Sequence, residues 1–212
     1  MGARGEGNRR ACRLTGGAEN NQEGAGMATD VTPVRRVVTG NDARGRSCVL
    51  IDSAAPNVNA NAIRPGKGMT DLWVFDACPA LIAGARDDGD LPFHFEPPER
   101  GGHLRIVQSP AWQPDYDPAR DASAVPLHAP RQRPGGTWER GGANAFTSAT
   151  HKSQTVDYGI LIEGERVLIL DDGEYVIKPG DVVVQVGNWH AWGARGGAGL
   201  MAFVMMAAHF EG

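Results

Sequence analysis

Cysteine is scarce in this sequence, whose 212 residues include only Cys12, Cys48 and Cys78. The three are far apart, so there is neither the C-x-x-C pair of many zinc and redox sites nor the dense set that staples small secreted domains. Such usage suits a reducing compartment. Because the four arginines near the start are followed by no apolar stretch, a secretory signal is not indicated and we expect a cytoplasmic protein.

Long apolar runs and an excess of positive charge are missing as well. No run approaches the roughly 18 consecutive apolar residues that a membrane-spanning helix needs. Lys and Arg number 21 against 25 Asp and Glu, a net charge of −4, which does not provide the basic face of a nucleic-acid-binding protein. We therefore expect neither a membrane nor a nucleic acid as a partner.

Several catalytic motifs are absent too. There is no G-x-S-x-G motif, and Cys48 and Cys78 have no acid or base near them in sequence. The glycine-rich segment 193–199 lacks the strand-then-helix context of a phosphate-binding loop and is typical of a hairpin turn. Neither a covalent nucleophile nor a dinucleotide site is thus predicted.

What the chain has instead is turn residues, with 29 Gly and 14 Pro, and short strands. In the last third, Asp172-Gly173 between two apolar runs indicates a hairpin, and residues 178–181 indicate a turn. Strands of about six residues, with turns roughly every 8 to 12 residues, favour an antiparallel barrel or sandwich. A short helix at 77–85 is compatible with this pattern.

Composition divides the chain into three parts. Residues 1–26 contain seven glycines and a single leucine, too little apolar surface to offset the entropy of ordering, so they are predicted to be a disordered leader. Residues 27–142 are predicted to supply N-terminal strands and a long strap, 111–142, whose prolines and aromatic side chains indicate a loop that packs over the barrel. Residues 143–212 are predicted to form the barrel core.

Four segments carry a resemblance to a known family. They are Y-G-I-L-I-E-G-E at 158–165, D-D-G at 171–173, K-P-G-D at 178–181 and G-N-W-H-A-W at 187–192. Together they resemble the cupin superfamily, in particular small single-domain cupins with an N-terminal strap, to which R-V-V-T-G at 36–40 is also similar. The resemblance implies an all-β fold, a single cupin (jelly-roll) β-barrel with an N-terminal strand and strap extension, and a homodimer.

The metal-binding motifs of cupins are partly kept. Counted back from Gly164, the family pattern places His151 at the first histidine position, Ser153 at the second and Asp157 at the glutamate position, while His190 matches the histidine of the second motif. The departures are Ala145 at a glycine, Gln185 at a proline and Ala194 at an asparagine. The resemblance thus implies His151, Asp157 and His190 as ligands of a divalent Fe, Mn, Ni or Zn ion.

Strand alternation groups the same side chains. His151, Ser153, Thr155 and Asp157 fall on one face of a strand, and a polar row in an apolar barrel is costly unless its members are paired or bind a ligand. His190 follows an apolar strand and can bring a second imidazole to the same mouth. Two His and one carboxylate suit Fe, Mn, Ni or Zn. Without a metal, Asp157 is expected as general base and a histidine as general acid.

Aromatic and hydroxyl side chains complete the predicted site. Trp189 and Trp192 flank His190 and are predicted, with Ser153 and Thr155, to line a substrate pocket. The histidines expected at the surface or in the strap are His94, His103 and His128.

The predicted function is that of a small-molecule enzyme acting at the barrel mouth with a divalent metal. It would oxygenate, decarboxylate or isomerise a small organic acid or aromatic compound. Two alternatives stay open: a metal-free cupin that uses Asp157 and His190 for acid–base chemistry, and a non-catalytic barrel that binds a small ligand or keeps the polar cluster for structure alone. Convergence of the side chains on one solvent-connected point would favour the enzyme.

Overall fold

The computed structural model describes residues 31–61, 64–82, 86–111 and 115–211. The predicted disordered leader, residues 1–26, lies outside the described residues. Among those described, there is no helix that could span a lipid bilayer.

Strands form nearly all of the regular structure. In chain order they are β1 (Arg35–Asn41), β2 (Ser47–Ala54), β3 (Asn57–Ala60), β4 (Gly68–Phe75), β5 (Gly102–Ser109), β6 (Arg131–Gln132), β7 (Trp138–Glu139), β8 (His151–Lys152), β9 (Thr155–Gly164), β10 (Arg166–Leu170), β11 (Gly173–Ile177), β12 (Val182–Val186), β13 (Ala191–Gly193) and β14 (Gly199–Ala207). The described residues contain no α-helix and one 3-10 helix, η1 (Pro118–Arg120). The all-β fold class is confirmed, whereas the short helix considered for 77–85 does not form over 77–82.

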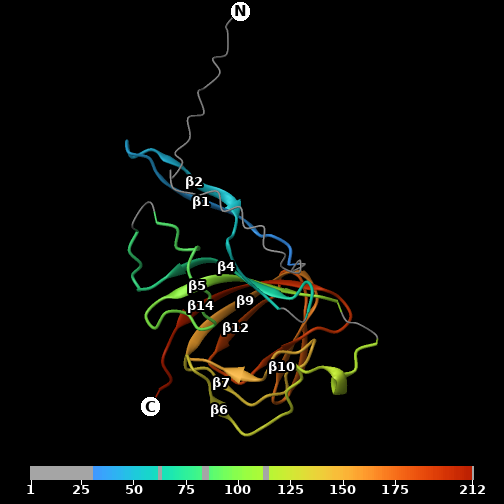
Figure 1. The fold of residues 1–212 in the computed structure, drawn as a ribbon. Coiled ribbons are helices and arrows are strands. Elements are labelled where there is room, and N and C mark those ends of the chain that lie inside the picture. Colours follow the sequence, from blue (N-terminus) through green and yellow to red (C-terminus); the bar gives the residue numbers. More distant parts are fainter. Residues whose placement is uncertain (1–30, 62–63, 83–85, 112–114, 212) are drawn as a thin grey trace, which may run out of the picture.

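The larger sheet has six strands in the order β12-β9-β14-β5-β4-β3, each antiparallel to its neighbours (Figure 1). Alternation explains its two faces: in β9, Thr155, Asp157 and Leu161 are buried, while Tyr158 and Ile162 are exposed. β5 and β14 pair along the length of β5. Strands from the two halves of the chain therefore belong to one sheet.

A smaller sheet has the order β11-β10-β13. The hairpin predicted at Asp172-Gly173 joins its strands β10 and β11. The turn predicted at 178–181 also forms, closed by a hydrogen bond of 2.9 Å from the amide of Asp181 to the carbonyl oxygen of Lys178. Both turns that the sequence predicts in this part of the chain therefore form where they were expected.

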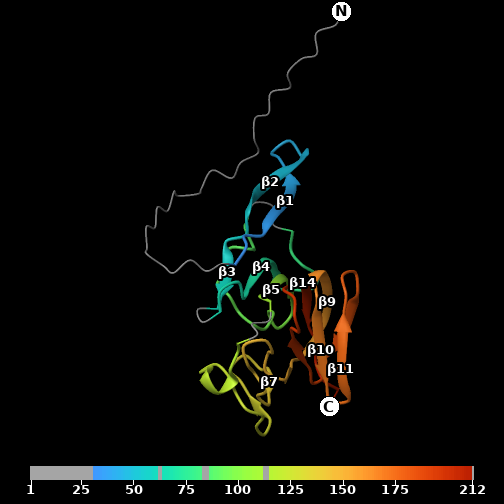
Figure 2. The ribbon, with the colours of Figure 1, turned by 90° about the vertical axis from the view of Figure 1, so that its right-hand side faces the viewer.

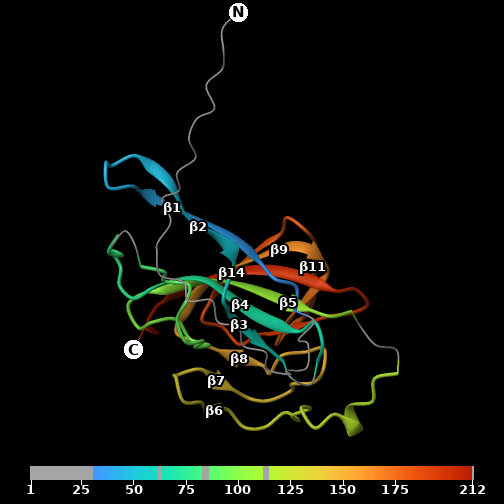
Figure 3. The ribbon, with the colours of Figure 1, turned by 45° about the horizontal axis from the view of Figure 1, so that its top comes forward.

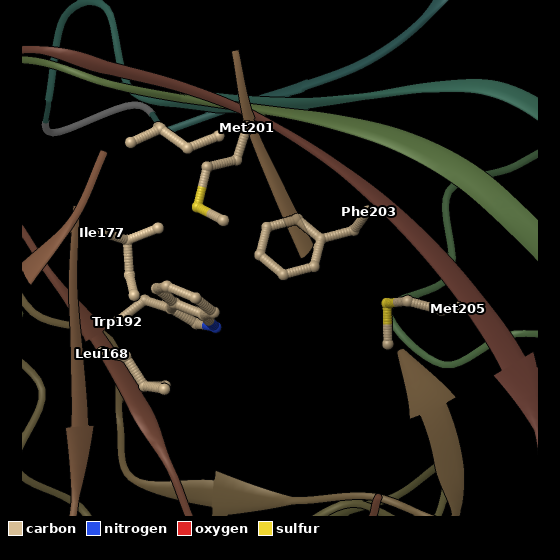
Figure 4. Packing of buried hydrophobic residues seen from close by; sticks show 7 residues of the cluster. Leu168, Ile177, Trp192, Met201, Phe203 and Met205 are labelled. Carbon is tan, nitrogen blue, oxygen red and sulfur yellow. The ribbon is translucent and has the colours of Figure 1, made fainter. Parts of the chain in front are cut away.

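The core lies between the two sheets. Its buried side chains are Leu161, Met201, Phe203 and Met205 from the larger sheet and Leu168, Ile177 and Trp192 from the smaller one. The rings of Trp192 and Phe203 meet edge to face with their centroids 5.6 Å apart. Figure 4 shows the labelled side chains converging from opposite strands. Because burial of one such side chain contributes roughly 1.5–3 kcal/mol, the cluster holds the sheets together.

The N-terminal hairpin β1–β2 projects from one end of the molecule (Figure 2). Arg36 anchors it, because the guanidinium donates to the carboxylate of Asp87 and, at 3.3 Å, to the carbonyl oxygen of Leu72 in β4. The hairpin is therefore tied to the larger sheet at its base while its tip stays exposed.

The described part of the predicted strap, 111–142, is not wholly irregular. It contains η1 and the short strands β6 and β7, and β7 lies beside β8 (Figure 3). In this pair Glu139 lies opposite His151. The hydroxyl of Tyr116 accepts a hydrogen bond of 3.1 Å from the amide of Ala145. The strap is thus held against the segment that carries one of the predicted site histidines.

Candidate functional site

A cavity of about 110 Å³ opens between the two sheets. Four residues predicted for the site border it: His151, Asp157, His190 and Trp192. Apolar side chains that also border it include Met69, Val107, Phe146, Phe203 and Met205. An apolar cavity of about 150 Å³ can hold benzene, so a space of this size suits a small organic molecule or part of one.

The backbones of His151 and His190 hold the two imidazoles side by side. The amide of each donates to the carbonyl oxygen of the other, at 2.8 and 3.0 Å, and the ring centroids are 4.4 Å apart. The Nδ1 atoms lie 2.7 Å from the carbonyl oxygen of Ala149 and 3.0 Å from that of Asn188, respectively. Since a carbonyl oxygen only accepts, each Nδ1 carries the ring proton and each Nε2 keeps a lone pair.

Burial lowers the pKa of both histidines. For His190, burial and then the neighbouring His151 lower the pKa to about 3. For His151, burial is again the largest cause of the lowered pKa. Both rings are therefore neutral near pH 7, and His190 has no proton on Nε2 to give. The expected role of His190 as a general acid does not suit this ring, which can instead accept a hydrogen bond from a ligand.

Asp157 lies near the start of β9, is 4% exposed, and has no hydrogen-bond partner for Oδ1 among the described residues. Burial raises the pKa of Asp157 to about 6, partly offset by the hydroxyl of Thr155 and the charge of Arg105. A carboxyl group that titrates near neutrality can both accept and return a proton. The environment of Asp157 therefore suits a general base.

Gln185 belongs to the site but was noted in the sequence only as a departure from the cupin motif. It lies opposite Asp157 across the β9–β12 pair, is 3% exposed, and borders the same cavity. Neither the amide nitrogen nor the amide oxygen has a partner in the described part of the chain. The available signal was a single polar residue in the apolar strand Val182–Val186.

Three basic side chains that were not predicted for the site also border the cavity: Lys67, Arg105 and Arg166. Arg105 is fully compensated, since its Nε lies 2.6 Å from Asp71 Oδ1 and its guanidinium also donates to the carbonyl oxygen of His94 at 2.6 Å. No sequence signal distinguishes Lys67 and Arg166 from surface cations. Only the packing of the sheets brings them to the cavity.

Three side chains expected in the substrate pocket lie elsewhere. Ser153 and Thr155 border a different cavity, and their hydroxyl oxygens are 2.7 Å apart. The ring of Trp189 lies 4.8 Å from the guanidinium carbon of Arg140 and 5.4 Å from the ammonium nitrogen of Lys152. It does not border the cavity that holds Asp157.

The prediction that His103 lies at the surface or in the strap is wrong. His103 is in β5, is 2% exposed, and has no partner for Nε2 among the described residues. Burial and then the charge of Arg105 lower the pKa of His103 to about 4. It borders the same second cavity as Ser153 and Thr155 and is a neutral, buried histidine.

The donor set does not fit the implied metal. In the part of the chain that the structure describes, no three His, Cys, Asp or Glu side chains are grouped closely enough to hold one ion. His151 and His190 provide two neighbouring imidazoles, but Asp157 does not complete a three-ligand group with them. The Fe, Mn, Ni or Zn centre implied at these three residues thus lacks its third donor in this arrangement.

Comparison with known proteins identifies relatives. No protein-family model matches the chain. It is 39% identical over 148 residues to phomopsin biosynthesis cluster protein D of Diaporthe leptostromiformis, which covers 68% of this chain and 73% of that protein. It is 45% identical over 60 residues, 28% of this chain and 31% of the relative, to the cupin-domain-containing oxidoreductase virC of Hypocrea virens.

Among solved structures, the cupin domain of Cnp3 from Schizosaccharomyces pombe is similar with a TM-score of 0.37 and 8% identity, covering 82% of this chain and 87% of that one. The resemblance stated from the sequence is confirmed by the relatives. The chain belongs to the cupin superfamily.

Proposed function

We propose that the protein is a cupin-type enzyme that transfers a proton on a small carbonyl compound bound in the cavity, with Asp157 as general base. One observation carries the proposal. Asp157 and Gln185 lie opposite each other and present buried polar atoms, unbonded by any described residue, to a mainly apolar cavity. Each unbonded buried group costs about 1–3 kcal/mol, which a ligand that bonds it recovers.

The reaction follows from these two groups. The ionised carboxylate of Asp157 removes a proton from the carbon next to a carbonyl, and the electron pair of that bond moves onto the carbonyl oxygen. The amide N–H of Gln185 donates to the oxyanion that develops. Protonated Asp157 then returns the proton to another carbon of the delocalised anion, so the net reaction is an isomerisation in which no atom is gained or lost.

His151 and His190 serve to orient the substrate in this scheme. Their Nδ1 protons are bonded to backbone carbonyl oxygens, so the Nε2 lone pairs can accept from a substrate hydroxyl or N–H. Because both rings stay neutral, they add no charge beside the carboxylate. Trp192, from the smaller sheet, contributes an apolar wall of the cavity and contacts Phe203 of the larger sheet edge to face.

The name of virC favours oxidation as a second candidate function. In that case Asp157 would remove one proton from the substrate while a hydride passes to an organic two-electron acceptor of the quinone class, which is reduced to the hydroquinone as it takes up the proton. Both candidates share the proton abstraction, and they differ in whether the product is oxidised.

Proton exchange tests the proposal directly. Purified protein is incubated in D₂O with a panel of 2-keto acids, 3-keto acids and 1,3-diketones, and loss of C–H signal is followed by NMR. We expect the protein to accelerate exchange for part of the panel, and Asp157→Asn to slow it by at least about 100-fold. Tyr158→Phe, which changes an exposed side chain on the same strand, should leave the rate unchanged.

Exchange at the uncatalysed rate for every compound would contradict the proposal, as would a fully active Asp157→Asn protein. Oxygen uptake is recorded in the same reactions with an artificial electron acceptor present or absent. Product oxidation that depends on Asp157 would favour the second candidate over isomerisation.

A further inference from the structure

We propose that Arg166 and Lys67 form an anion subsite at one side of the cavity and bind the carboxylate of a small organic acid. The substrate would then be held by its carboxylate while its carbonyl reaches Asp157. This inference deepens the proposed function and rests on it for the position of the reacting carbon. The anion subsite itself stands on separate observations.

Arg166 is a buried cation for which no described residue provides an ion-pair partner. It begins β10, borders the cavity and is 6% exposed. Its Nε has no hydrogen-bond partner, and within the described ranges no carboxylate pairs with its guanidinium. Burial is the one cause that acts on its pKa, which falls to about 10. The guanidinium stays charged near neutral pH, and a buried charge is costly until an anion lies against it.

Among the described residues, three other arginines are buried: Arg36 and Arg105 each pair with a carboxylate, and Arg64 contacts a backbone carbonyl oxygen and two aromatic rings. Arg105 forms a two-point ion pair with Asp71, at 2.6 and 3.1 Å. Arg36 pairs with Asp87. Arg166 carries the same guanidinium group and is buried to a similar degree, but it borders the cavity and pairs with no described carboxylate.

Lys67 brings a second positive charge to the same cavity. Burial and then the charges of Arg64 and Arg166 lower its pKa. Arg64 is already engaged, because it donates to the carbonyl oxygen of Ala145 and its guanidinium carbon lies 4.3 Å from the ring centroid of Phe146. Lys67 and Arg166 are thus the cations that remain for a ligand. Their mutual repulsion decreases when an anion lies between them.

One carboxylate, Asp121, acts on Lys67 in the opposite direction. Its oxygens already accept hydrogen bonds of 2.8 Å from the hydroxyl of Tyr116 and of 2.6 Å from that of Ser123. It does not border the cavity. Asp121, which lies in the strap, therefore offsets part of the charge repulsion on Lys67. It does not occupy the side of Lys67 and Arg166 that faces the cavity.

The neighbouring backbone makes room for Arg166. A Cβ at Gly199 in β14 would lie 2.8 Å from Cδ of Arg166, so glycine at this position lets the long side chain pass. A carboxylate matches the two-donor edge of a guanidinium. Because the remaining walls are mainly apolar, an acid with a small apolar body fits better than a strongly hydrated phosphate.

Binding of simple probes to the full chain tests the subsite. Calorimetry compares butanoate, butanamide and inorganic phosphate as ligands of the parent protein and of Arg166→Met, Arg166→Lys, Lys67→Met and Asp157→Asn. We expect butanoate to bind at least about tenfold more tightly than butanamide, and Arg166→Met to abolish that preference. Arg166→Lys should retain part of it, and Arg35→Met, on the exposed hairpin, should retain all of it.

Binding and proton exchange are measured on the same variants, so failure of the anion subsite can be distinguished from failure of the proposed reaction. Asp157→Asn should lose proton exchange and still bind butanoate, which would show the subsite without depending on catalysis. Equal binding of butanoate and butanamide to the parent protein would overturn the subsite, as would an unchanged preference in a folded Arg166→Met protein. Arg166-dependent binding of phosphate with no binding of butanoate would overturn the assignment to a carboxylate.

Discussion

Asp157 lies directly opposite Gln185 in the antiparallel pair β9–β12, and both side chains enter one cavity. Each is nearly fully buried and each has a polar atom that no described residue bonds. An apolar pair at these two positions would pack in the same space without that cost. The pair therefore lowers stability in return for two groups that can act on a ligand.

The first prediction concerns stability and Asp157. Its pKa is raised from 3.8 to about 6 in the folded protein, so the ionised carboxylate destabilises the fold above about pH 6. Asp157→Asn removes this penalty. We expect the free energy of unfolding at about pH 8 to rise by up to roughly 3 kcal/mol, and the gain to disappear near pH 3, below both pKa values, where the parent carboxyl is mostly protonated in both states.

Urea denaturation at both pH values measures this difference. Asp90→Asn, at an exposed carboxylate, is the matched control and should be neutral at both. A destabilised Asp157→Asn protein at about pH 8 would mean that the carboxylate holds the fold together rather than serving a ligand.

The second prediction concerns Gln185. Gln185→Leu replaces an unbonded amide by an apolar side chain of similar size, so the protein should fold with equal or greater stability. The rate of proton exchange should fall by about 100-fold, the usual effect of losing one oxyanion donor. The thermal midpoint and the exchange rate are measured on the same sample. Full activity in Gln185→Leu would remove the amide from the proposed reaction.

Much of the fold could be predicted because it depends on local signals. Alternation placed Asp157 and Leu161 on the inner face of β9 and Tyr158 on the outer face. Turn residues located the hairpin at Asp172-Gly173 and the turn that follows it. Ser153 and Thr155 are buried on the same face as Asp157, as alternation predicts, but they border a different cavity, which alternation alone does not specify.

The candidate site could be predicted only where its residues lie near one another in sequence or match the cupin motif. His151, Asp157 and His190 were identified in this way. Gln185, Lys67 and Arg166 come to the cavity through strand register and sheet packing, which a single sequence does not specify. The polar groups of these three residues border the cavity, and in the proposed scheme they bind the ligand.

The third prediction concerns acid stability and His103. Its pKa is lowered from 6.5 to about 4, so the unfolded chain binds the proton more readily than the folded protein does. The contribution of neutral His103 to the free energy of unfolding is intact above about pH 6.5. It decreases as the pH falls toward about 4, by up to roughly 3 kcal/mol. His103→Leu should flatten the stability profile in that window, whereas His209→Leu, at an exposed histidine, should not. Parallel profiles for His103→Leu and the parent protein would show that His103 is not buried as described.

The fourth prediction concerns metal. Because His151, Asp157 and His190 do not form a three-donor group, treatment with a chelator should leave proton exchange unchanged. Elemental analysis before and after treatment checks whether an ion was removed. Loss of activity on chelation, with recovery on adding Fe, Mn, Ni or Zn and no recovery in His151→Ala or His190→Ala, would instead support a metal centre.

The pH dependence of proton exchange by the parent protein tests the central role of Asp157 most directly. The base must be ionised to act, so the rate should rise with a single inflection near pH 6 and then stay level to about pH 8, because His190 remains neutral throughout. A rate that is independent of pH between about 5 and 8, or one that falls as the pH rises through 6, would contradict general-base catalysis by Asp157.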